Sequence, residues 1–325
     1  MPQSQFKNSL RKITILEEEL IPWLLEGDVS IQYQTHRDLL GVKKPELQGR
    51  IATEGWGTKL LSARQPEGHW GRGFYQPKWI SSHYSLLDLK YLNISPDVPV
   101  IKESILQIAH NHKSEDGGVN PHRDHRGNPV SDMCINGMFL DYACYFRVDE
   151  SELKSVVDCI INHQMPDGGY NCRINRGGAV HSSLHTTISI LEGLWEYKKN
   201  GYTYRVDELE KIAAESCEFI LMHRLYKSDK TGEIINKKFL MLSYPSRWFY
   251  NILRALDYFQ AAGVDYDPRM QDALDVLIKK RRKDGTWPVQ AKHAGKVHFD
   301  MEKTGGPSRW NTLRALKVLK QFDIG

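Results

Sequence analysis

Apolar residues recur at helical spacing in segments along the whole chain, with polar residues between them. An apolar stripe repeating every three to four residues is typical of a helix with one buried side. Further helical segments lie between these, and one of them ends in basic residues, which suit a helix C-terminus. The alternation predicts an all-α array of helix pairs. The first group comprises 83–92, 134–146, 185–197, 248–259 and 310–320, with a shorter copy from His36, and the second includes 151–164 and 270–282.

A turn motif with a period of about fifty residues separates these helices. It has a basic residue or Gln, a Gly four residues later, and a bulky apolar residue two positions after the Gly. The glycines are 49, 51 and 117 residues apart, and a degenerate copy near Gly232 divides the last gap. Asp116, Asp167 and Asp284 precede three of the glycines, and Asp-Gly pairs favour tight turns, so we assign these carboxylates a structural role. The copies are Arg64-Gly68-Trp70, Lys113-Gly117-Val119, Gln164-Gly168-Tyr170 and Arg281-Gly285-Trp287.

This period predicts the architecture of the whole chain. Open helical arrays need polar caps on their end repeats, whereas six helix pairs can close into a ring without ends. We therefore predict an all-α fold, an (α/α)6 toroid, formed by a single domain of residues 1–325. Residues 1–45 would contribute the first helix pair. The inner helices would line a central cavity, and the glycine turns would lie at one rim.

Composition narrows the function classes. The 325 residues have a mean hydropathy of −0.51 and 26% charged residues, as in globular proteins that are not membrane-embedded. A formal charge of +4 is small for this length and does not indicate a nucleic-acid partner. The sequence shows no long apolar run and its start lacks a signal-peptide core, so we expect a cytoplasmic protein. Five scattered cysteines without CxxC spacing indicate reduced thiols.

The turn motifs resemble the QW-type repeats of terpenoid cyclases and of protein prenyltransferase β subunits. The copy at 164–170 is the most similar one, and the resemblance extends over about residues 50–320. It implies an (α/α)6 toroid with its active site in the central cavity. Squalene-type cyclases carry a DxDD motif, which this sequence lacks, so that activity is not expected.

The prenyltransferase β subunits instead bind zinc through an Asp-x-Cys at the start of one inner helix and a His that opens the next. Asp132-Met133-Cys134 and His185-Thr186-Thr187 stand at the corresponding places. The resemblance therefore implies a Zn²⁺ site formed by Asp132, Cys134 and His185. Protein prenylation itself is not expected, because those β subunits act with a separate α subunit and Ile135 replaces a Tyr often found after the Cys.

The residues favour zinc independently of the resemblance. Cys134 and His185 begin successive inner helices, so both would point into the same cavity mouth. Thiolate, imidazole and carboxylate are accepted zinc ligands, and three protein ligands leave a fourth position open, as in catalytic sites. The competing interpretation makes Cys134 a small buried residue and His185 a hydrogen-bonded core histidine. Reserve ligands are His83, His181 and Cys172.

Other residues are candidates for substrate contact and for proton transfer. Loop arginines near the metal helices would bind an anionic group, and aromatic residues at inner-helix starts would form a wall. Titratable residues before the last inner helix would act as general acid or base, although each of these groups has an ordinary solvated or packing role as its alternative. The substrate-binding candidates are His83, Arg123, Arg126, Arg176, Trp248 and Trp310, and the catalytic candidates are Asp300, Glu302 and His298.

Together these features predict a zinc-dependent enzyme that acts on a small anionic or isoprenoid-like substrate in a central cavity. One alternative is a metal-free cyclase or isomerase that uses the aromatic cavity and an acid such as Asp300. Another is a non-catalytic toroid that binds a lipid or peptide. The substrate, the reaction and any partner subunit are not identified by the sequence.

Overall fold

Helices make up most of the computed structural model, which describes residues 19–121, 131–172 and 177–323. The predicted all-α class is thereby confirmed. In these residues the only sheet pairs β1 (Trp287–Pro288) with β2 (Pro307–Ser308). The helices are α2 (Val29–Gln34), α3 (Pro45–Arg50), α4 (Gly55–Ser62), α5 (Ser82–Tyr91), α6 (Pro99–Asn111), α7 (Met133–Tyr145), α8 (Glu150–Asn162), α10 (Leu184–Lys199), α11 (Val206–Met222), α12 (Ile252–Ala261), α13 (Gln271–Lys279) and α14 (Arg309–Gln321), with a π-helical turn η1 (Thr35–Leu39) and 3₁₀ turns η2 (Lys78–Ile80), η3 (Lys237–Leu240) and η4 (Pro268–Met270).

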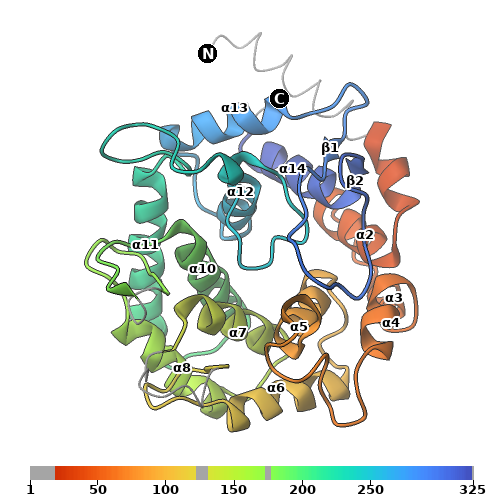
Figure 1. The fold of residues 1–325 in the computed structure, drawn as a ribbon. Coiled ribbons are helices and arrows are strands. Elements are labelled where there is room, and N and C mark those ends of the chain that lie inside the picture. The colour runs from red at the N-terminus through yellow and green to blue at the C-terminus, as the bar shows by residue number, and fades with distance from the viewer. Residues whose placement is uncertain (1–18, 122–130, 173–176, 324–325) are drawn as a thin grey trace.

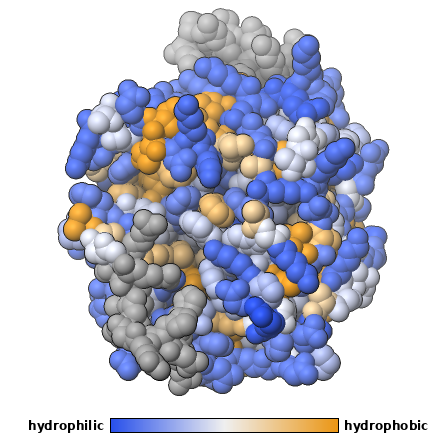
Figure 2. Space-filling model, in the orientation of Figure 1, coloured by the Kyte–Doolittle hydropathy of each residue, from blue (hydrophilic) through white to orange (hydrophobic). Residues whose placement is uncertain are grey.

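Inner and outer helices alternate along the chain. Helices α5, α7, α10, α12 and α14 lie nearer the centre of the molecule, and α6, α8, α11 and α13 lie outside them (Figure 1). Successive inner helices contact one another, and α14 also contacts α2 and η1. In the face seen in Figure 2 the surface is mainly hydrophilic, with hydrophobic residues in scattered patches. No helix of the described chain has the length and apolarity needed to cross a membrane.

Contacts between the last and the first helices are specific. The Arg309 Nε donates to the Trp23 carbonyl at 2.9 Å, and its guanidinium lies 4.6 Å from the centre of the Trp23 ring. At the other end of α14, the Lys320 Nζ donates to the Leu39 carbonyl at 2.8 Å. These bonds join segments that are far apart in the sequence.

The repeated turns share one geometry. The φ angles of Gly68, Gly117, Gly168 and Gly285 lie between 82° and 92°, a conformation that residues with a Cβ rarely adopt. At Gly117 a Cβ would also lie 2.7 Å from the Ser155 carbonyl oxygen of the neighbouring outer helix. The four glycines are therefore required by backbone conformation, as the spacing predicts.

In three of the four turns the bulky residue after the glycine anchors the turn to the preceding outer helix. The side chains of Trp70, Tyr170 and Trp287 are fully buried, and each donates a hydrogen bond to the carbonyl ten residues earlier in the chain. The backbone N–H of each also donates to a hydroxyl near the start of the following inner helix, Ser82, Thr187 or Thr312. One residue thus fixes an outer helix, a turn and an inner helix together.

Helices α7 and α10 approach each other closely because both carry a glycine at the contact. A Cβ on Gly193 would lie 2.5 Å from the Gly137 carbonyl oxygen, and a Cβ on Gly137 would lie 2.4 Å from the Ser189 carbonyl oxygen. Close packing of these two helices brings their N-terminal ends together. That arrangement positions the candidate metal residues.

Two predicted helix starts differ from the structure. Helix α12 begins at Ile252 and not at Trp248, because the Asn251 side chain caps it by accepting the Arg254 N–H. The segment from His36 does not open an inner helix: it forms η1 at the end of α2. The other six amphipathic segments, beginning at 83, 134, 151, 185, 270 and 310, start within one residue of their helices.

The two rims of the molecule differ in their connections. Each outer helix leads to the next inner helix through a long segment, such as 112–132, 223–251 or 280–308. Each inner helix leads to the next outer helix through a short one, such as 146–149 or 200–205. Consequently the N-terminal ends of the inner helices lie under long connections, and their C-terminal ends lie beside short ones.

Candidate functional site

Two cysteines meet at the N-terminal end of α7. Cys134 is the second residue of this helix, and Cys172 lies in the connection that leads to α10. The Cys172 Sγ accepts hydrogen bonds from the Cys134 N–H at 3.1 Å and from the Thr186 hydroxyl at 3.5 Å. Asp132 is the N-cap residue of α7 and is 9% exposed. We call Asp132, Cys134 and Cys172 the thiol cluster.

The two thiols affect each other's pKa in opposite directions. A hydrogen bond to Cys172 and burial raise the pKa of Cys134 well above its usual value. Burial also raises the pKa of Cys172, but the Cys134 thiol, the Thr186 hydroxyl and the Cys134 N–H donate to its sulfur, and the net pKa is lowered. The Asp132 carboxylate opposes ionisation of both. Cys172 is therefore the thiol that ionises first, at the positive end of a helix.

An aromatic and basic wall stands beside the thiol cluster. The Lys78 ammonium lies 4.9 Å from the Trp79 ring centre and 5.1 Å from that of Trp248. The Tyr75 and Tyr84 hydroxyls are 3.3 Å apart, and burial, followed by the charge of Cys134, raises the pKa of Tyr75. A cation and several ring faces thus border the two sulfurs.

His185, the third predicted ligand, is engaged with the segment before α12. Its Nδ1 accepts the Tyr250 N–H at 2.8 Å, and its ring packs 5.0 Å from Trp248 and 5.1 Å from Phe239. Burial lowers the pKa of His185 to about 4, so the ring is neutral near pH 7. Since Nδ1 accepts a hydrogen bond, the ring proton lies on Nε2, which cannot bind a metal while protonated.

One other group could hold a metal ion. The ligand atoms of Asp116, Cys159 and His163 all lie within 4.8 Å of one another, and this is the only such group of three among the residues that the structure describes. Neither the trio of Asp132, Cys134 and His185 nor the thiol cluster therefore forms such a group as it stands. The metal assignment to these three residues stays a prediction.

The Asp116 group also has the structural role expected of the repeated turn. Asp116 accepts the Ser131 N–H and hydroxyl, and Asp167 accepts those of Ser182 in the same way, fifteen residues on in each case. The His163 Nδ1 bonds the Cys159 carbonyl at 2.7 Å, as a helix end requires. Most of the polar atoms of this group are thus already used by the fold.

The three predicted catalytic residues line one small pocket of about 100 Å³. The Glu302 carboxylate accepts the Arg309 N–H at 2.6 Å and so caps α14. Asp300 is largely exposed and pairs with Lys292 at 2.8 Å. The His298 Nε2 is 2.9 Å from the Ser85 hydroxyl, and burial lowers its pKa to about 4. Their catalytic role stays untested, and Glu302 has a clear structural one.

The predicted substrate-binding residues are dispersed. His83 is fully buried, its Nδ1 lies 3.2 Å from the Tyr142 hydroxyl, and burial lowers its pKa to about 3. Trp248 stacks on Phe249 at 4.0 Å beside the thiol cluster, whereas Trp310 lines a separate cavity in the centre of the molecule. Arg123, Arg126 and Arg176 lie outside the described residues.

Sequence reasoning missed two features of this rim. The sequence makes Cys172 only a reserve ligand, because a separation of 38 residues from Cys134 gives no sign that the two are in contact. The available signal was the position of Cys172 just after the Gly168 turn and before the next inner helix. A buried ion pair of Asp88 with Arg247 was not anticipated. Its partners are 159 residues apart.

Comparison with known proteins adds no assignment. No protein-family model matches the chain, and no curated protein matches it either. The family resemblance of the turn motifs accordingly remains a proposal, and the site must be interpreted from its own chemistry.

Proposed function

We propose that this protein is a zinc-dependent enzyme with an (α/α)6 toroid fold, and that the thiol cluster holds the metal. The observation that carries the proposal is the contact of Cys172 with the N-terminus of α7 next to Cys134. The Asp132 carboxylate and the Cys134 sulfur come from the start of α7, and the Cys172 sulfur comes from the connection that leads to α10. All three are among the ligands that zinc accepts, and binding the metal would draw their ligand atoms closer together than they lie in this structure.

The donor set suits zinc for a physical reason. Cys172 receives an N–H and a hydroxyl as donors, which is the environment of a thiolate. A second thiol beside a thiolate ionises only when a cation compensates its charge, and a divalent metal does so. Bound zinc would supply a Lewis acid at this rim. His185 is a further candidate ligand, provided that its ring exchanges the Tyr250 hydrogen bond for the metal.

The surroundings indicate the substrate class. Lys78 would attract an anionic group, and the Trp79, Trp248 and Phe249 rings would hold an apolar body against it. Small substrates that are anionic or isoprenoid-like combine these properties. A transferase, lyase or hydrolase reaction is consistent with this arrangement, and the contacts of α14 with α2 support a ring that encloses it.

The test is the metal content of purified protein without a metal-binding tag, measured by elemental mass spectrometry. We expect close to one zinc per chain, and we expect its loss in Cys134→Ser and in Cys172→Ser. Cys159→Ala is the matched control, because it alters the Asp116 group alone. His185→Gln reports whether this residue belongs to the ligand set.

Two results would contradict the proposal. Protein that stays free of zinc after incubation with the metal has no such site. Zinc that persists in Cys134→Ser but is lost in Cys159→Ala would place the metal at Asp116, Cys159 and His163, at the outer turn and away from the aromatic wall.

A further inference from the structure

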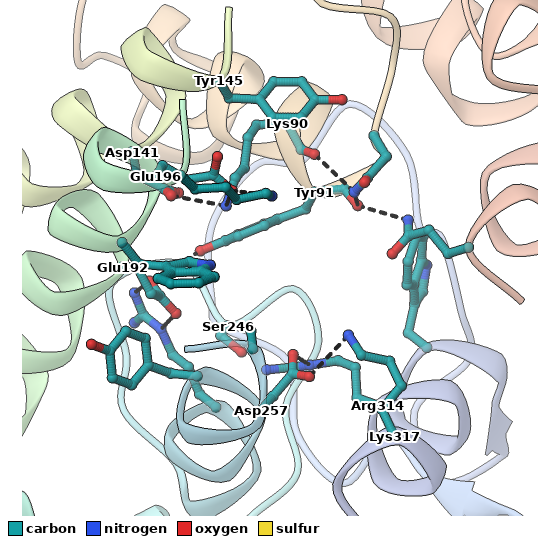
Figure 3. A pocket seen from close by; sticks show the side chains of 18 of the residues that line it. Lys90, Tyr91, Asp141, Tyr145, Glu192, Glu196, Ser246, Asp257, Arg314 and Lys317 are labelled. Atoms are coloured by element: carbon teal, nitrogen blue, oxygen red, sulfur yellow. Dashed lines mark hydrogen bonds and ion pairs between the residues drawn. The ribbon is translucent and has the colours of Figure 1, made fainter. Parts of the chain in front are cut away.

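A second site lies between the inner helices. It is a cavity of about 180 Å³, and none of the thiol cluster lines it. Its walls come from α5, α7, α10, α12 and α14, with Tyr244 and Ser246 from the connection before α12 (Figure 3). We call it the central cavity, and it is independent of the zinc proposal.

Within the described residues, the central cavity is lined by six cations and four carboxylates. Its two more exposed cations, Arg37 and Lys199, pair with the nearby Asp38 and Glu196. The other charged side chains form three buried groups, in which every cation comes from a different helix than the carboxylate that it contacts. The side chains of these three groups are between 1% and 20% exposed, so little solvent separates them. The three groups are Lys90 with Asp141 at 2.8 Å and Glu196 at 3.5 Å, Arg254 with Glu192 at 2.5 Å, and Asp257 with Arg314 at 2.9 Å and Lys317 at 3.1 Å.

Two polar groups in the wall have neither a hydrogen-bond partner nor an ion pair in the described chain. They are the Ser246 hydroxyl and the Trp310 indole N–H, in residues that are 4% and 2% exposed. A buried polar group without a partner costs roughly 1–3 kcal/mol, and natural proteins rarely leave one unsatisfied. Both residues line the central cavity. Their polar atoms are covered in this structure, so a guest with hydrogen-bonding groups would satisfy them after a small shift of the wall.

Aromatic rings complete the wall. Tyr91, Trp195 and Tyr258 line the cavity between the ion pairs. The Tyr91 hydroxyl donates to the Glu192 carboxylate at 3.5 Å, a long bond that a closer acceptor could replace. The cavity therefore offers flat apolar faces, hydroxyl and ammonium donors, and carboxylate acceptors within a small space.

We propose that the central cavity binds a neutral, polyhydroxylated small molecule about the size of one sugar ring. Hydroxyl groups both donate and accept, so they can meet the carboxylates of Glu192 and Asp257 and the orphaned Ser246 and Trp310 groups together. The C–H faces of such a ring would lie on the aromatic side chains. Since water occupies about 30 Å³ per molecule, the volume of about 180 Å³ equals that of about six waters.

Other ligand classes fit less well. An anion would face the Glu192 and Asp257 carboxylates, and a cation would face the ammonium of Lys90, which is held in place by two carboxylates. A hydrocarbon would leave all of these groups without solvent or partner, at a high cost in free energy. A neutral ligand with many hydroxyls avoids each of these penalties.

The test is binding of a panel of small molecules to the full-length protein, followed by tryptophan fluorescence and ligand-observed NMR. The probes are glucose, galactose, mannose, xylose and myo-inositol, with glucuronate and glucosamine as charged analogues and geraniol as an apolar one. We expect at least one neutral polyol to bind, and the analogue that carries a charge to bind more weakly. The Cys134→Ser protein should bind it equally well, because the thiol cluster is elsewhere.

Variants assign the binding to this cavity. Ser246→Ala removes one orphaned hydroxyl and should weaken binding roughly two- to tenfold, with no loss of thermal stability. Trp195→Ala should weaken it further, while Ser151→Ala on the exposed end of α8 should leave it unchanged. The proposal is overturned if no neutral polyol binds, if geraniol or a charged analogue binds more tightly, or if Ser246→Ala and Trp195→Ala both bind as the unaltered protein does.

Discussion

Several histidines at the rim of the inner helices are held neutral by burial. The pKa of His83 is lowered to about 3, and those of His185, His293 and His298 to about 4, in each case mainly because burial disfavours the charged ring. An unfolded chain protonates these rings near pH 6.5. Between about pH 6.5 and 4 the unfolded state therefore binds more protons than the folded state, and these residues make the protein less stable as the pH falls.

His298 allows this effect to be measured for one group. In His298→Gln the ring is absent, so the variant lacks one source of acid destabilisation. The quantity to follow is the difference between the two free energies of unfolding, that of the unaltered protein minus that of the variant. This difference should rise with pH between 4 and 6.5, with a slope of at most about 1.4 kcal/mol per pH unit. Urea titrations at several pH values give this difference. A difference that does not change with pH would mean that His298 titrates normally in the folded protein.

Single residues of the site were predictable only where the local sequence determines their place. The Asp132-x-Cys134 motif begins a helix, so its position at the rim follows from periodicity. Cys172 lies in an irregular connection, and its contact with Cys134 depends on how α7 and α10 pack. The charge compensation around Lys90 likewise depends on three helices, and no spacing in the sequence indicates it.

Among the helices, α7 and α10 depend most on small residues at their contact. Gly193→Ala should lower the free energy of unfolding by about 1–3 kcal/mol, because the added Cβ meets the Gly137 carbonyl oxygen. Gly49→Ala is the matched control, since Gly49 lies in α3 with no atom within 4 Å of the added Cβ. That change should stabilise the protein by about 0.5–1 kcal/mol.

Chemical denaturation of both variants measures the two effects. Equal shifts in the same direction would show that helix propensity alone governs both positions. Zinc content should fall in Gly193→Ala if the spacing of α7 and α10 sets the thiol cluster, and Gly49→Ala should keep it.

Periodicity predicted the helices and turns well, and its failures have local causes. The hydrophobic pattern from Trp248 continues smoothly into α12, but the Asn251 cap delays the helix by four residues. The segment from His36 has the composition of an inner-helix start, yet α2 already begins at Val29. In both segments a capping hydrogen bond determines where the helix begins, and the spacing of apolar residues does not reveal that bond.

At the scale of the whole molecule, the contacts of α14 with the first helices are the feature that the proposed ring requires and an open array lacks. A double-mutant cycle of Trp23→Ala and Arg309→Ala should give a coupling energy of about 0.5–2 kcal/mol. The control cycle pairs Trp23→Ala with Arg50→Ala. Arg50 is a suitable control because its guanidinium forms a surface ion pair with Glu54. Additive effects in the first cycle would mean that the seam contributes nothing to stability.

The alternation of outer and inner helices was predictable from the repeat, since each period supplies one of each. The contacts between the last and the first helices were not, because the Arg309 and Lys320 bonds join the two ends of the described chain and leave no periodic trace. The central cavity was expected, but its ion pairs arise only when all the inner helices are in place.

The unequal connections of the two rims affect how the protein can change over time. The thiol cluster lies beneath long segments, whose length and composition can vary without moving a helix. The central cavity has most of its charged wall on the helices themselves. Their C-terminal ends are joined by short segments, where an insertion would displace the helices. Descendants of this chain should therefore diversify at the thiol rim and retain the opposite rim, so that one chemistry could be replaced while the other is inherited.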